Sequence, residues 1–319
     1  MNTPPLVSVV IPSFNQAEFL EEALRSVALQ DYRPIEQIVI DGGSRDGTVD
    51  LLRRWTAEDH RAGYACRWIS EPDRGHADGL NKGFGLVTGD IVGWLNSDDV
   101  YFDRRAVTCA VEALAAHPEV DVVFGDVALI SETSGLWSIW SFPKFDYKRA
   151  LRNYIIPQPT VFFRRCVTDK YRLDPALKVA VDHVYWLQIG REHKFLHVGR
   201  VQAGDRDHSK RQTHINRTLW QQTATDMCRR FGGDYRPGTL EKYHDVLVRL
   251  LMRFKGVLHL AAMFARPGLP ADLAFPMWID NKKDVLIRQL TMRLGNRPRL
   301  RRPAAMSRKA EPHRTKSST

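Results

Sequence analysis

The chain has 319 residues, 43% of them apolar and 10% aromatic, which is enough for one large domain around a buried core and excludes disorder throughout. Its net charge of +10 is concentrated at one end. Residues 282–319 hold twelve Lys or Arg and two acidic residues, whereas the other 281 residues hold 35 of each sign. The body is therefore not a polyanion-binding surface, and no nucleic-acid partner is expected.

Cysteine usage and the amino terminus indicate the compartment. The four cysteines have neither the paired spacing of a zinc site nor the dense pattern of a disulfide framework: Cys66, Cys109, Cys166 and Cys228. Residues 1–5 lack a basic region, and the apolar run 6–11 is too short for a signal peptide. The best candidate for a membrane span, residues 246–264, is interrupted by basic residues. We expect a cytoplasmic protein with reduced thiols.

Short β-rich runs alternate with helical patterns through residue 127, which predicts an α/β fold whose sheet is mostly parallel in its first half. The expected strands are residues 6–11, 37–40, 66–69, 90–95 and 120–127. Helices are expected at residues 17–29, 48–55, 77–87 and 104–116. Beyond residue 128 the pattern is irregular, apart from a helical stretch at 182–191.

The carboxyl-terminal end combines a predicted amphipathic helix with a basic tail. Apolar residues spaced three and four apart from Leu240 to Ala261 predict an amphipathic helix. Residues 297–319 are rich in Arg, Pro, Ser and Lys, so burial cannot offset their ordering entropy and we expect disorder. The helix either packs on the main domain beside a solvated tail, or it contacts an anionic membrane surface with the basic residues.

Polar residues follow the predicted strands, at the edge where open α/β sheets bind ligands. They form four segments: residues 12–15, 41–44, 71–78 and 96–99. Clustered carboxylates and amides are costly there unless a cation or polar ligand is bound. The adjacent Asp98 and Asp99 would suit a divalent ion that binds a diphosphate on its far side, or they could cap the helix that begins near Arg104.

Two common nucleotide-binding folds are excluded by the first strand and its turn. The strand is followed by Pro-Ser-Phe-Asn and not by G-x-G-x-x-G, which excludes a dehydrogenase. No G-x-x-x-x-G-K-[ST] occurs either, which excludes a P-loop kinase or ATPase.

Four ordered motifs resemble the family 2 glycosyltransferases with a GT-A fold. They are VSVVIPSFN (7–15), IDGGSRDGT (40–48), EPDRG with DGLNKG (71–83) and GDIVGWLNSDD (89–99), and the similarity extends over about residues 5–215. The resemblance implies a nucleotide-diphosphate sugar donor, Mg²⁺ or Mn²⁺, and inversion at the anomeric carbon. It also implies a glycan or lipid-linked acceptor in bacterial surface-polysaccharide assembly, and so a protein that is cytoplasmic or peripheral at the inner face of the cell membrane.

The resemblance also assigns roles to residues of the first half. It implies a nucleotide-sugar pocket lined by Pro12, Ser13, Asn15, Asp41, Asn81, Lys82 and Asp98, with Asp41 on the base and Asn81 and Lys82 near the base and diphosphate. Asp98 and Asp99 match the D-x-D region that contacts ribose and metal. Asn96 stands where many members have the first Asp, so Asp98 and Asp99 must hold the ion.

For the second half, the resemblance implies the groups that act on the acceptor. Asp182, in Ala-Val-Asp-His-Val-Tyr-Trp, matches the general base, although Val181 replaces the usual Glu; otherwise it caps the helix. Its neighbour His183 is an acceptor contact or a surface residue. Gln158 is a candidate acceptor contact or part of a plain loop, and His208 a candidate metal ligand or a structural histidine.

These assignments divide the chain into three parts. Residues 1–235 form the catalytic domain, with a nucleotide-sugar half at 1–127 and an acceptor half at 128–235. A helical extension at 236–296 and a basic tail at 297–319 follow. Two other functions stay open, a nucleotidyltransferase and a non-catalytic nucleotide-sugar-binding protein. The first should carry a Gly-rich basic loop after its first strand, and the second should lack Asp98, Asp99 or Asp182.

Overall fold

The computed structural model describes residues 3–58 and 61–233. The expected helix from Leu240, the extension 236–296 and the tail 297–319 lie outside the described residues. The four cysteines are free. None of the helices in residues 3–58 and 61–233 combines the length and the apolar character needed to cross a membrane.

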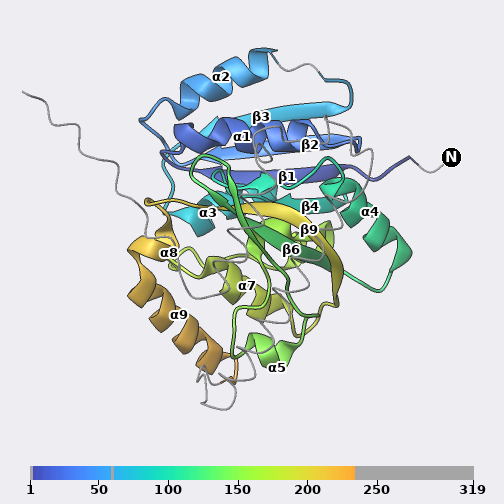
Figure 1. The fold of residues 1–319 in the computed structure, drawn as a ribbon, viewed down its shortest axis with the longest axis vertical. Coiled ribbons are helices and arrows are strands. Elements are labelled where there is room, and N and C mark those ends of the chain that lie inside the picture. The colour runs from blue at the N-terminus through green and yellow to red at the C-terminus, as the bar shows by residue number, and fades with distance from the viewer. Residues whose placement is uncertain (1–2, 59–60, 234–319) are drawn as a thin grey trace, which may run out of the picture.

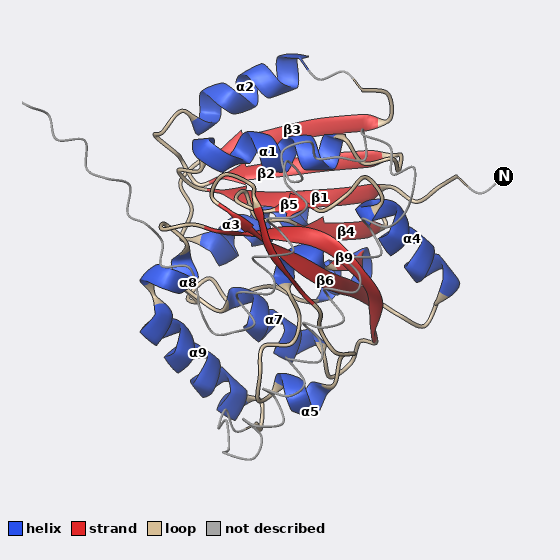
Figure 2. Ribbon diagram, viewed as in Figure 1, coloured by secondary structure: helices blue, strands red, loops and turns tan. Residues whose placement is uncertain are grey.

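One mixed sheet forms the centre of the part of the chain that the structure describes (Figures 1 and 2). Its strand order is β3-β2-β1-β4-β8-β6-β9-β5, and β7 pairs with β6. The strands are β1 (Val7–Ser13), β2 (Ile35–Asp41), β3 (Tyr64–Ser70), β4 (Ile91–Trp94), β5 (Val100–Tyr101), β6 (Val122–Ser131), β7 (Leu136–Trp140), β8 (Phe162–Arg164) and β9 (Phe195–Asp207).

The first four strands are parallel because a helix returns the chain after each of the first three. The helices of this half are α1 (Ala17–Ala28), α2 (Thr48–Glu58), α3 (His76–Leu86) and α4 (Ala106–Ala116). Alternate residues of β1 enter different cores: Val9 packs with α1, α2 and α4, whereas Val10 packs with α3. Both faces of the parallel half are therefore covered, which explains its continuous apolar runs.

The second half completes the same sheet. Strand β8 lies between β4 and β6 and is antiparallel to both, while β6 and β9 are parallel. Its helices are α5 (Tyr147–Ala150), η1 (Gln158–Thr160), α6 (Arg165–Lys170), α7 (Val181–Ile189), α8 (Gln212–Ile215) and α9 (Arg217–Arg230). Helix α9 packs against α7. The expected boundary at residue 127 falls within β6, so the two halves share one sheet.

The predicted α/β class is confirmed, and each expected element of the first half is present with ends shifted by a few residues. Strands β5, β7, β8 and β9 were not predicted. Strand β8 is three residues long, and the first six residues of β9 are half-buried without apolar alternation. Their formation depends on neighbours far away in the sequence, which a local pattern does not reveal.

Candidate functional site

Polar strand ends meet at one edge of the parallel half. In the sheet register Ser13 lies beside Asp41, and Asp41 lies beside Ser70. Strand β4 ends at Trp94, which pairs with Val10, so the following residues 96–99 emerge at this edge too. The structure therefore brings the ends of the four segments together, as the strand pattern suggested.

Asp41 organises the turn after β2. Its fully buried carboxylate accepts hydrogen bonds from Gly43 N (3.2 Å), Ser44 N (3.0 Å) and Ser70 Oγ (2.6 Å), and from the Ser44 hydroxyl. Gly43 adopts φ of 85°, a left-handed conformation that glycine adopts without strain. The carboxylate thus holds the turn of residues 41–44, and its contact with a nucleotide base stays a prediction.

The loops after β1 and β2 are joined through Asn15. Its backbone N donates to Ser44 Oγ (2.6 Å), and its Oδ1 accepts from Arg45 N (2.9 Å). Asn15 adopts φ of 53°, a left-handed conformation that asparagine tolerates better than most residues. Pro12 and Ser13 are buried beneath this loop. The two loops consequently form one polar rim above the sheet.

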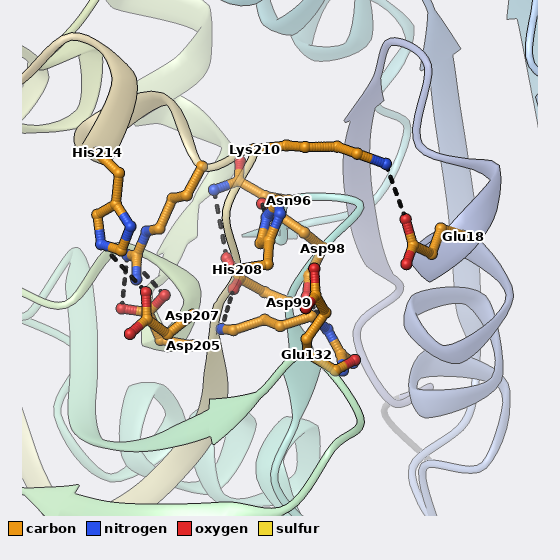
Figure 3. Close-up of polar contacts among 12 residues, drawn as sticks. Glu18, Asn96, Asp98, Asp99, Glu132, Asp205, Asp207, His208, Lys210 and His214 are labelled. Atoms are coloured by element: carbon orange, nitrogen blue, oxygen red, sulfur yellow. Dashed lines mark hydrogen bonds and ion pairs between the residues drawn. The ribbon is translucent and has the colours of Figure 1, made fainter. Parts of the chain in front are cut away.

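The turn that contains Asp98 and Asp99 is clamped by β9 (Figure 3). Asp99 accepts hydrogen bonds from Arg206 N (3.0 Å) and from Asn96 Nδ2 (3.3 Å). The buried Arg206 guanidinium donates to the Asp98 carbonyl (2.8 Å) and to Glu22 Oε2 on α1 (2.6 Å). It also donates to three oxygens of the β6–β7 turn, at Ser131, Glu132 and Ser134. One side chain therefore fixes this turn to α1 and to the second half.

The charges at this turn are unbalanced. Burial would raise the pKa of Asp98, but the hydrogen bond from His208 and the charges of His208 and Arg211 hold it below its ordinary value. For Asp99, burial and the negative charges of Asp98 and Asp205 raise the pKa well above its ordinary value. Arg211 is already committed to Asp205, with Nη2 2.7 Å from Oδ1. The charge of Arg211 therefore lowers the pKa of Asp99 less than burial and the two neighbouring carboxylates raise it.

His208 and the two carboxylates have the chemistry of a hard-cation site. The His208 Nε2 atom lies 3.0 Å from Asp98 Oδ2, and its buried Nδ1 has no hydrogen-bond partner among the described residues. Nowhere in residues 3–58 and 61–233 do three His, Cys, Asp or Glu side chains form a complete metal cage. A pair of carboxylates still suits Mg²⁺ or Mn²⁺, because such ions are commonly held by one or two carboxylates together with substrate phosphates. The residues present therefore fit the implied ion.

Asp182 lies in the first turn of α7, in the second half. Its Oδ2 accepts a hydrogen bond from Tyr154 Oη (2.9 Å). Burial raises the pKa of Asp182, although the hydrogen bonds from Tyr154 and from the backbone of His183 oppose the rise. A carboxylate that is partly buried and has a raised pKa can accept a proton more readily than a fully solvated one. This geometry is compatible with the base assignment and does not test it.

Gln158 connects the two carboxylate regions. It is 4% exposed, its Nε2 donates to the Trp94 carbonyl (2.8 Å), and its Oε1 accepts from Asn96 Nδ2 (2.7 Å). Because Nε2 is fixed on a carbonyl, Oε1 must accept, and residue 96 must be a donor. An aspartate at position 96 could not serve, which explains the departure from the D-x-D pattern. The structure thus favours a linking role for Gln158 over an acceptor contact.

Three other assigned residues have contacts away from this turn. Asn81 bonds the backbone of Leu173 through Nδ2 (2.8 Å) and Oδ1 (3.0 Å), so it ties α3 to the second half. Lys82 Nζ lies 2.7 Å from Glu71 Oε1 and 3.1 Å from the Pro72 carbonyl.

His183 is 2% exposed beside Cys228, and burial lowers its pKa to about 4. Of the two interpretations of His183, a surface residue is excluded.

Sequence reasoning missed three residues of this region. Arg206 is 1% exposed near the end of β9, a strand that the local pattern did not reveal. Tyr154 lies 28 residues before its partner Asp182, and no local motif marks it. Phe14 is 59% exposed between Ser13 and Asn15. The sequence did contain a signal for Phe14, because this large aromatic residue interrupts the polar segment 12–15.

Known proteins share both the sequence and the fold. An uncharacterized glycosyltransferase of Mycobacterium tuberculosis is 40% identical over 126 residues, which are 39% of this chain and 46% of the relative. A PGL/p-HBAD biosynthesis glycosyltransferase of Mycobacterium bovis is 30% identical over 161 residues, which are 50% and 60% of the two chains. The chain thus spans about half the length of the curated relatives it matches.

Solved structures of glycosyltransferases have the same fold. A mannosyltransferase of Pyrobaculum calidifontis, in complex with GDP-Man and Mn²⁺, superposes with a TM-score of 0.56 at 23% identity, covering 92% of this chain and 88% of that one. TarS 1–349 of S. aureus, in complex with UDP-GlcNAc, gives a TM-score of 0.54 at 14% identity, covering 92% and 93%.

The sequence profile of glycosyl transferase family 2 matches residues 8–168, which include the four strand-end segments and Gln158. This match spans half of the chain. The chain belongs to glycosyl transferase family 2.

Proposed function

We propose that this protein transfers a sugar from a nucleotide-diphosphate sugar to an acceptor hydroxyl, with inversion at the anomeric carbon. The observation that carries the proposal is the Asp98–Asp99 turn at the carboxyl edge of the sheet, where two adjacent carboxylates lie beside His208 and where burial and the charges of Asp98 and Asp205 raise the pKa of Asp99. Family membership supports it, as do the donors and the Mn²⁺ in the two structures with the same fold.

The donor lies across the first half in this proposal. The rim formed by Pro12, Ser13 and Asn15 receives the nucleoside, and the Phe14 ring between them is exposed for stacking on the base. Asp98 and Asp99 hold a Mg²⁺ or Mn²⁺ ion, with His208 as a further ligand. When bound, this ion supplies positive charge against the diphosphate.

Asp182 acts on the acceptor. Its carboxylate takes the proton of the acceptor hydroxyl as the oxygen attacks the anomeric carbon, and the nucleoside diphosphate departs. One displacement needs no covalent nucleophile and inverts the configuration. We place donor binding in residues 1–127 and acceptor binding in residues 128–235, with a glycan or lipid-linked acceptor of surface-polysaccharide assembly. The basic segment 282–319 fits recruitment to an anionic membrane surface on the cytoplasmic side.

The experiment is donor hydrolysis by the full chain with UDP-, GDP- and dTDP-sugars, with and without Mn²⁺. We expect Mn²⁺-dependent release of one nucleoside diphosphate and a fall of about 10²-fold or more in Asp98→Ala. Asp50→Ala is the matched control, since that exposed aspartate pairs with Arg53 on α2, away from the strand-end segments. If no sugar nucleotide is turned over or bound, and Asp98→Ala behaves like Asp50→Ala, the proposal fails.

A further inference from the structure

Tyr154 holds the carboxylate of Asp182. The phenol Oη lies 2.9 Å from Asp182 Oδ2, and this is the side-chain hydrogen bond of Asp182 within the described residues. Tyr154 comes from the segment after α5, whereas Asp182 opens α7, so the bond joins two separate elements. Removing it would take away the side-chain donor to Oδ2 and leave the backbone donors of Asp182 and His183.

The direction of this hydrogen bond is fixed by a second one. The backbone N of Gln158 donates to Tyr154 Oη (3.1 Å), so the phenol oxygen is already an acceptor and its single proton is directed to Asp182. Burial and the charge of Asp182 raise the pKa of Tyr154 well above its ordinary value, and the phenol stays protonated at neutral pH. Tyr154 is therefore a donor to the ionised carboxylate.

The same contacts connect Asp182 to the donor side of the molecule. Gln158, whose backbone holds Tyr154, bonds through its side chain to Asn96, and Asn96 bonds to Asp99. The Tyr154 ring also packs beside Trp220 of α9, with 6.3 Å between ring centroids. A shift of Tyr154 would thus disturb the position of Asp182 relative to the Asp98–Asp99 turn.

We propose that Tyr154 is a positioning residue for Asp182: its phenol holds Oδ2 and leaves Oδ1 to accept the proton of the acceptor hydroxyl. This inference rests on the proposed function, in which Asp182 is the base. The bond also favours the ionised carboxylate, because a donor stabilises the charged form against burial.

Other charged groups near Asp182 act independently of Tyr154. The guanidinium of Arg211 favours the ionised form of Asp182, and Asp205 lies close enough to raise the pKa of Tyr154. His183 is adjacent in α7, and burial lowers its pKa to about 4, so it is neutral near pH 7. These groups stay in place when the phenol oxygen alone is removed.

The test compares Tyr154→Phe with Tyr185→Phe in the full chain. Tyr185 is the matched control: it lies on α7, is fully buried, and its hydroxyl has no partner among the described residues. The side-chain carboxyls of aspartates are labelled with ¹³C, the Asp182 signal is assigned by its loss in Asp182→Asn, and its pH titration is followed by NMR. We expect the midpoint to rise by about one pH unit or more in Tyr154→Phe and to stay unchanged in Tyr185→Phe.

Kinetics provides a second readout. With the sugar nucleotide that the wild type hydrolyses, kcat of Tyr154→Phe should fall about tenfold or more at unchanged KM, and the acid limb of its pH profile should move to higher pH. An Asp182 titration that is the same in Tyr154→Phe and wild type would overturn the inference. Asp182→Asn that retains wild-type kcat would instead refute Asp182 as the base, while the NMR titration would still report the bond.

Discussion

The carboxylates of the Asp98–Asp99 turn and the carboxylate of Asp182 have different surroundings. At the turn, two adjacent carboxylates share one edge with Asp205, while the Arg206 guanidinium donates to carbonyls and pairs with Glu22, and Arg211 pairs with Asp205. Asp182 accepts a hydrogen bond from the phenol of Tyr154, and the charge of Arg211 favours its ionised form. The turn therefore needs a further positive charge, whereas Asp182 needs only orientation. We infer that the first is the cation and donor side and the second the proton-accepting side.

The sharpest way to break this comparison is to remove the clamp of the turn. Arg206→Met leaves buried oxygens at Asp98, Ser134 and the β6–β7 turn without their donor, and Glu22 without its partner. We expect a loss of about 3 kcal/mol in the free energy of unfolding, measured by urea denaturation. Lys210→Ala is the control, because its ion pair with Glu18 is exposed and its loss should leave the free energy of unfolding nearly unchanged. Equal losses would show that Arg206 is not a clamp.

A smaller effect is expected where the two regions are linked. Asn96→Asp removes the donor to Gln158 and Asp99 and adds a third carboxylate, so we expect a loss of about 2 kcal/mol in urea denaturation without divalent ions. Asn216→Asp makes the same change in an exposed hydrogen bond with Gln212 and should cost less than about 0.5 kcal/mol. An Asn96→Asp protein as stable as wild type would contradict the orientation assigned to Gln158.

The smallest effect concerns a carboxylate with no proposed part in transfer. Glu36 Oε1, at the opposite edge of the sheet, accepts from Thr88 N (2.7 Å) and Gly89 N (3.2 Å), and Oε2 pairs with Arg67 (3.0 Å). Burial would raise the pKa of Glu36, but hydrogen bonds from Ser8 and Thr88 and the charge of Arg67 lower it overall. A lowered folded-state pKa means that the ionised group stabilises the fold above its unfolded pKa of about 4.3, and that this is lost as pH falls.

Glu36→Gln tests whether the ionised Glu36 stabilises the fold and loses this effect as pH falls. At pH 7 we expect a loss of about 1 kcal/mol, because an amide faces the Arg67 guanidinium, and the difference from wild type should shrink between about pH 5 and pH 3. Urea denaturation across this range measures it, with Glu21→Gln as the exposed control. Donor hydrolysis at pH 7 should be unchanged in both. A difference that grows as pH falls would contradict the direction of the Glu36 pKa.

The two halves also differ in how far the sequence could predict them. Strands β1 to β4 each have an apolar run followed by a polar turn, so both the elements and the edge where Ser13, Asp41 and Asp99 meet follow from local patterns. Strand β8 and the contacts of Arg206 and Tyr154 depend on residues 28 to 184 positions away. An arginine in a polar segment ordinarily stays in solvent, so nothing local marks Arg206 as buried.

The most direct test of the account is calorimetric titration of UDP, GDP and dTDP into wild type, Asp98→Ala and Asp182→Asn, each with and without Mn²⁺. The account predicts that one nucleoside diphosphate binds the wild type in a Mn²⁺-dependent manner. Asp98→Ala should lose this dependence, and Asp182→Asn should retain it with unchanged affinity. Equal weakening in both variants, or binding that ignores both Mn²⁺ and Asp98, would contradict the division between the two carboxylate regions.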